Sequence, residues 1–152
     1  GHRGEYFADV SATILTAYSA CRLDGLPPDM GAAGGVFFLA CHDILHRAVS
    51  IATIGREEAN KESETHPSDE DRAVVIYHAY ASLLEYRRNP DGSMDLAIRS
   101  HPQPLDPSTP AAKEMHSQVF SHAYALFEIW EHVRARLLED FVAGRKPHEM
   151  WQ

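Results

Sequence analysis

Apolar side chains recur every three or four residues in four long stretches of this chain, and this periodicity decides its fold class. Residues at this spacing lie along one side of an α-helix, where they can pack against a core. None of the stretches shows the clear alternation of apolar and polar residues that is typical of a half-buried strand. The sequence therefore predicts an all-α fold of about four main helices, at residues 3–22, 29–54, 67–88 and 111–143.

The segments between the predicted helices are charged or rich in proline. Residues 56–64 mix acids and bases, and we expect them to be exposed. Residues 89–110 contain five prolines and are expected to wrap the surface as one long connector. Three glycines at positions 31–35 would weaken the start of a helix, or would allow a second helix to approach closely. A chain of 152 residues suits a single core, so we expect one compact helical domain over residues 1–152.

Charge and cysteine usage narrow the classes of function. The chain carries 22 acids against 14 bases, a formal charge of −8, whereas nucleic-acid binding needs a basic face. The most apolar run, residues 31–40, is too short to span a membrane. Cys21 and Cys41 are the two cysteines, which gives no readable disulfide framework. We therefore expect a cytoplasmic protein without a membrane span and without a nucleic-acid partner.

Two acids open the first predicted helix. Glu5 and Asp9 stand in the segment Glu-Tyr-Phe-Ala-Asp, one helical turn apart and on the same face. A carboxylate is a good zinc ligand, and a second carboxylate one turn later can orient a neighbouring ligand. The spacing is also common on ordinary solvated helix faces, so the pair alone leaves both interpretations open.

A second polar motif stands at the start of the third predicted helix. Residues 65–72 read Thr-His-Pro-Ser-Asp-Glu-Asp-Arg. Ser68 followed by Asp71 has the spacing of a helix N-cap with an acid three residues later. His66 and Arg72 could therefore serve local purposes, His66 by capping backbone groups and Arg72 by pairing with nearby acids.

Taken together and in this order, the two motifs resemble the C-terminal half of CAAX prenyl proteases and HtpX-like zinc metallopeptidases, of the gluzincin group. In that family a zinc-binding HExxH helix is followed by E-x-x-A-D and then by T-H-P-x-x-x-x-R. The resemblance implies that Glu5 is the third zinc ligand and that Asp9 orients a zinc-bound His. It implies that His66 and Arg72 brace the site, and that zinc-activated water attacks a peptide carbonyl.

The chain departs from the family pattern because it contains no HExxH motif. His148-Glu149 is followed by Met-Trp-Gln and lacks the second His. In the family the motif precedes the position of Glu5. We therefore expect the chain to be part of a longer peptidase, acting on a peptide or protein substrate, in which an upstream segment supplies HExxH. The alternative is a non-enzymatic helical binding or regulatory module, because this chain alone lacks the full catalytic set.

A third candidate site lies in the second predicted helix. His42 and His46 are one turn apart and could chelate one metal, with Glu5 as a further ligand. Asp43 would then take the place of the general base that Glu holds in HExxH. In the peptidase family, however, the helix with two His precedes the E-x-x-A-D helix, whereas here it follows.

The same segment also resembles the His-Asp centre of HD-domain phosphohydrolases, which are all-helical and metal-dependent. By that resemblance His42 and Asp43 would be metal ligands, and His2 would be the earlier His of the set. The family also needs a distant Asp, and the sequence does not mark one out. An HD-like phosphohydrolase is therefore a further alternative.

Overall fold

The computed structural model describes residues 2–22, 25–60 and 66–146. It contains four helices and two short strands: α1 (Arg3–Arg22), α2 (Asp29–Ile54), α3 (Asp69–Leu83), β1 (Leu84–Arg88), β2 (Met94–Ile98) and α4 (Pro110–Val142). The predicted all-α class and the number of main helices are confirmed. The two strands form a small hairpin beside the helices.

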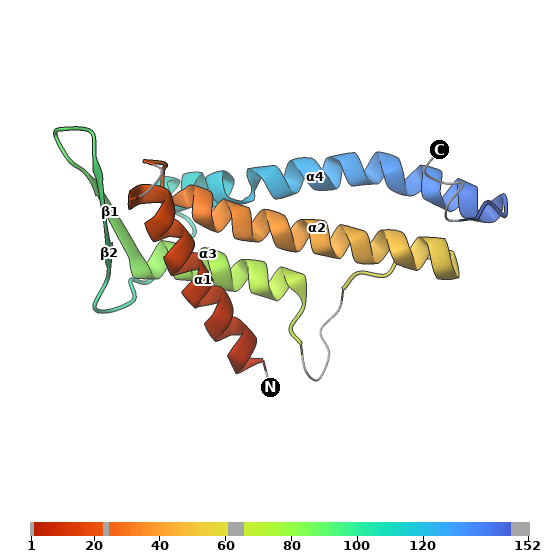
Figure 1. Ribbon diagram of the computed structural model, residues 1–152, viewed down its shortest axis with the longest axis horizontal. Coiled ribbons are helices and arrows are strands. Elements are labelled where there is room, and N and C mark those ends of the chain that lie inside the picture. Colours follow the sequence, from red (N-terminus) through yellow and green to blue (C-terminus); the bar gives the residue numbers. More distant parts are fainter. Residues whose placement is uncertain (1, 23–24, 61–65, 147–152) are drawn as a thin grey trace.

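Helix α2 is the centre of the fold. It lies beside α4 for most of its length, and it also packs against α3 and α1 (Figure 1). Helix α1 crosses the others obliquely and contacts both α2 and α3 (Figure 1). This arrangement brings the first helix of the chain against the start of α3, although more than 40 residues separate them.

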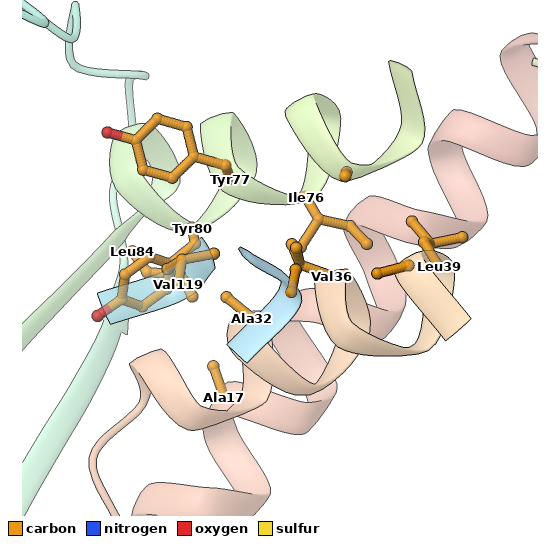
Figure 2. Close-up of a cluster of buried hydrophobic side chains, with 12 residues drawn as sticks. Ala17, Ala32, Val36, Leu39, Ile76, Tyr77, Tyr80, Leu84 and Val119 are labelled. Atoms are coloured by element: carbon orange, nitrogen blue, oxygen red, sulfur yellow. The ribbon is translucent and has the colours of Figure 1, made fainter. Parts of the chain in front are cut away.

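All four helices contribute to one hydrophobic core. Figure 2 shows side chains from α1, α2, α3, β1 and α4 converging around Val36 and Val119, both almost fully buried. Ile51 and Trp130 anchor a second cluster further along the α2–α4 contact. The core members of the first cluster are Ala17, Ala32, Val36, Leu39, Ala40, Ala73, Ile76, Tyr77, Tyr80, Leu84, Val119 and Ala123.

Small residues let α1 and α2 approach closely. A Cβ placed on Gly31 would lie 2.7 Å from the backbone nitrogen of Ala17 and 2.8 Å from the carbonyl carbon of Thr16. Such distances are shorter than van der Waals contact, so this position accepts only glycine without a shift of the helices. The close approach that the glycines at 31–35 allow is therefore present at Gly31.

The third predicted helix ends earlier than expected, and this is a correction. Helix α3 stops at Leu83, and Leu84 is extended (φ −99°, ψ 140°). Residues 84–88 pair antiparallel with 94–98, with Leu84 opposite Ile98. A turn joins the strands: the Asn89 N–H donates to the Ser93 carbonyl, and Gly92 has φ 85°. The predicted connector at 89–110 therefore begins with the turn and second strand of a hairpin.

The start of α3 follows the predicted capping pattern. Ser68 is the N-cap, and its side-chain oxygen accepts from the backbone N–H of Asp71 at 3.1 Å. The Ser68 hydroxyl also donates to the Asp71 carboxylate at 2.6 Å. Both bonds fix the orientation of the first turn of α3, which carries Arg72.

Helix α2 is also long and apolar enough to cross a membrane by length and composition, with a mean hydropathy of 1.3. Core helices of soluble proteins satisfy the same criterion. In this fold α2 packs against three other helices. The prediction that the chain has no membrane span stays a prediction.

Candidate functional site

The two motifs of the peptidase resemblance meet where α1 crosses the start of α3. We call Glu5, Asp9, His66 and Arg72 the α1–α3 cluster. Arg72 donates from Nε to Oδ2 of Asp9 at 2.9 Å and from Nη2 to Oδ1 at 2.8 Å. This is a bidentate pair, in which the planar guanidinium matches the carboxylate. It ties the first helix to the third.

Burial makes this pair strong. Asp9 is 7% exposed, although it is a charged residue on the second turn of a helix. A buried carboxylate is tolerated when an opposite charge and hydrogen bonds satisfy it. The hydrogen bonds to Asp9 raise the pKa of Arg72 above its ordinary value, and burial of the guanidinium opposes this only in part. Arg72 is therefore a permanent cation that orients Asp9.

Glu5 lies one turn before Asp9, at the open edge of the cluster. Its Oε2 is 4.0 Å from Nη2 of Arg72, and its Oε1 is 3.8 Å from Nε2 of His66. These distances are within ion-pair range but beyond hydrogen-bond length. His66 is exposed, with 69% of its side chain accessible. The Glu5 carboxylate therefore lies near the Arg72 guanidinium and the His66 imidazole, and it is partly accessible to solvent.

The described residues do not form a complete zinc site. Among residues 2–22, 25–60 and 66–146, no group of three or more His, Cys, Asp or Glu is arranged to hold a metal ion. Glu5 could contribute one carboxylate ligand, which is a suitable donor for zinc. Thr65, which opens the second motif, and the incomplete His148-Glu149 sequence lie outside the described residues. A zinc ion at this place would need further ligands from elsewhere.

The three residues of the His42–His46 motif bond to neighbouring residues of the protein rather than to one another. Nδ1 of His42 lies 2.8 Å from Oδ2 of Asp69, whereas Nδ1 of His46 lies 3.0 Å from the backbone carbonyl of Glu58. Asp43 accepts from Nε of Arg47 at 2.6 Å and from the backbone N–H of Asn60 at 2.8 Å. Both carboxylate oxygens of Asp43 accept hydrogen bonds, and the bond from Asn60 holds the segment that follows α2 against this helix. The metal and base roles of this motif stay predictions.

Asp69 lies beside His42 of the HD-like pair His42–Asp43, and no sequence motif had identified it. Its carboxylate bonds to His42 across 27 residues, and its Oδ2 also accepts from Nδ2 of Asn60 at 2.8 Å. Asp43 faces Arg47 instead, so the HD-like acid is paired with a cation. His2 contacts the ring of Tyr6 on α1.

Glu57 is a further residue that sequence reasoning missed, because residues 56–64 were expected to be exposed. Its carboxylate accepts from Nη1 of Arg47 at 2.8 Å, from Nε1 of Trp130 at 3.1 Å and from Nη1 of Arg134 at 3.0 Å. Burial raises the pKa of Glu57, but the bonds from Arg47, Arg134 and Trp130 outweigh it and hold the pKa below its ordinary value. Glu57 therefore joins the end of α2 to α4 as an anion.

Comparison of the chain with protein-family models, with curated proteins and with solved structures finds no match. Function is therefore inferred from the motifs and from the geometry described above.

Proposed function

We propose that this chain is the part of an HtpX-like zinc metallopeptidase that supplies the third zinc ligand, Glu5. One observation carries the proposal. Asp9 of the first motif and Arg72 of the second form a bidentate ion pair across 63 residues, with Glu5 and His66 at its edge. The two motifs on which the resemblance depends therefore lie together in the fold.

The geometry within the cluster suits the roles that the resemblance implies. Arg72 occupies both oxygens of Asp9, and each carboxylate oxygen has a second lone pair that can accept another donor. Asp9 can therefore take a His N–H in addition to Arg72, which is how carboxylates orient zinc-bound imidazoles. Glu5, which is less buried, is the carboxylate that can reach a metal outside the α1–α3 contact.

The proposal requires a segment that this chain does not contain. A zinc peptidase of this class needs two His ligands and a Glu that acts as base, and an HExxH helix supplies all three. When bound, zinc would polarise the substrate carbonyl and activate water for its hydrolysis. The residues of this chain would hold one zinc ligand, orient it through Asp9 and Arg72, and keep that part of the site folded.

The reading frame upstream of Gly1, and the activity of its complete product, test the proposal. We expect an HExxH motif in that frame and hydrolysis of unstructured peptide substrates that a zinc chelator abolishes. A frame without HExxH would overturn the peptidase proposal and would favour the non-enzymatic helical module. An HExxH-containing product that hydrolyses peptides equally well with and without chelator would also contradict it.

A further inference from the structure

A pocket of about 570 Å³ lies between α2, α3 and α4. None of the described residues that line it belongs to the α1–α3 cluster. Its volume is in the range of sites that hold small organic ligands. Its lining combines aromatic residues of α4 with polar residues that include Asp43, Arg47, Asn60 and Asp69.

Aromatic rings from one face of α4 form the apolar wall. Phe120 stacks on Tyr124 with ring centroids 5.9 Å apart, and His116 stacks on Phe120 at 4.4 Å. Tyr124 is 52% exposed although it lines the pocket, so its ring is available to a ligand. Stacked rings offer an apolar surface for a hydrophobic body and a negative face for a cation.

Asp69 is the distinctive group at the polar end. It is 4% exposed, and its Oδ2 is bonded to His42 and Asn60. Its Oδ1 is buried and has no hydrogen-bond partner within the part of the chain that the structure describes. Buried polar atoms are nearly always paired, so an unpaired carboxylate oxygen beside a pocket points to a donor that a ligand would bring. Oδ1 belongs to the carboxylate whose Oδ2 is held by His42 and Asn60, so it is fixed in place in a residue that lines the pocket.

The charges around the pocket favour a cation. Among the described residues that line it, the charged groups are the carboxylates of Asp43, Asp69 and Glu70 and the guanidinium of Arg47. That guanidinium is already held by Asp43 and Glu57. An anionic ligand would therefore meet excess negative charge, whereas an ammonium group would reduce it.

We propose that this pocket binds a small organic ammonium ion with an aromatic body. The ammonium N–H would donate to Oδ1 of Asp69, and the aromatic body would lie against Phe120 and Tyr124. This inference is independent of the peptidase proposal, because it uses other residues and needs no zinc. It assigns the α2–α3–α4 side of the domain a ligand-binding role of its own.

Titration of the chain with 2-phenylethylammonium at neutral pH, followed by NMR chemical shifts, tests the inference. Neutral 2-phenylethanol and anionic 3-phenylpropionate are matched probes of the same size. We expect saturable shifts at residues around Asp69, Phe120 and Tyr124, with an affinity about tenfold or more above that of the alcohol. The anion should bind more weakly than either. Absence of saturable binding, or equal affinity for amine and alcohol, would overturn the proposal.

Variants identify the groups that bind. Asp69→Asn should lower the affinity for the amine about tenfold, to that of the alcohol. Tyr124→Ala should weaken both probes, and its exposed position allows it to be replaced without loss of the core. Glu128→Gln and Ile129→Ala, on the same helix but outside the pocket, should leave binding unchanged. If Asp69→Asn does not fold, Tyr124→Ala is the variant that tests the proposal. Unchanged binding of the amine by Tyr124→Ala would overturn it.

Discussion

Arg72 on α3 holds Asp9 on α1 with two N–H donors, one to each carboxylate oxygen, across 63 residues of sequence. This pair joins the two motifs on which the proposed function depends. Its contribution to the free energy of unfolding can be measured without an activity assay. The pair also explains why a charged residue is buried on the second turn of α1.

Replacing either partner should destabilise the domain, because each replacement removes the bidentate hydrogen bonds of the other charge. Asp9→Ala and Arg72→Ala should each lower the free energy of unfolding by about 2 kcal/mol. The double variant should lose much less than the sum of the two. Urea unfolding of the four proteins gives the coupling energy.

The pair Arg22–Asp95 is a matched control for that measurement. Its atoms are 3.9 Å apart and its side chains are 51% and 58% exposed. Such surface pairs contribute about 0–1 kcal/mol. A coupling energy for Asp9–Arg72 as small as that of the control would contradict the structural role given to the pair.

Gly31 should be intolerant of any side chain. A Cβ at this position meets the backbone of α1 at 2.7 Å, so Gly31→Ala should push α1 and α2 apart and cost about 2 kcal/mol. At Gly34 nothing lies within 4 Å of the added Cβ, so Gly34→Ala should stabilise α2 by up to about 1 kcal/mol. Thermal unfolding of both variants tests the contrast, and the same sign of effect at the two positions would contradict the close packing.

Glu57 should make stability depend on pH in the acid range. Its pKa is held below the ordinary value in the folded state, so its ionised form stabilises the fold. That contribution is complete above the ordinary Glu pKa, roughly 4.3, and is lost as the pH falls through the lowered folded value. At neutral pH, Glu57→Gln should cost about 2 kcal/mol, because Arg47 and Arg134 lose their anion.

The difference in stability between the wild type and Glu57→Gln should therefore shrink as the pH is lowered below that range. Glu58→Gln is the control, because Glu58 is adjacent and more exposed than Glu57. Urea midpoints between neutral and strongly acidic pH measure both variants. A difference that is constant over this range would contradict the assignment of Glu57 as an anion that stabilises the fold.

The helices could be predicted from periodicity, because each carries an apolar stripe, and only the end of α3 lacked a clear signal. The bounds of α1 and α2, and Ser68 as the cap of α3, follow directly from these signals. The hairpin could not be predicted in this way, since only Leu84 is buried in β1 and the strand shows no alternation. The Asn-Pro-Asp-Gly sequence at 89–92 was the available signal for its turn.

Side-chain partners were less predictable than helices. The contact of Asp9 with Arg72 was not predicted, because nothing in the spacing of the sequence pairs α1 with α3. The family resemblance implied only that Arg72 braces the site to which Asp9 belongs. Glu57 was missed since a charged run normally faces solvent, and its partners Trp130 and Arg134 come from a helix more than 70 residues later. Such pairing depends on how the helices pack, whereas apolar periodicity indicates only where the helices lie and which face is apolar.

Zinc content of the complete gene product tests most directly whether Glu5 is a metal ligand. The purified product should carry about one zinc per chain, and Glu5→Gln should lower its zinc affinity at least about tenfold while the fold is kept. Glu114→Gln, an exposed change on α4, should keep the zinc. Equal zinc content in the wild type and in Glu5→Gln, or no zinc in either, would contradict the role proposed for Glu5.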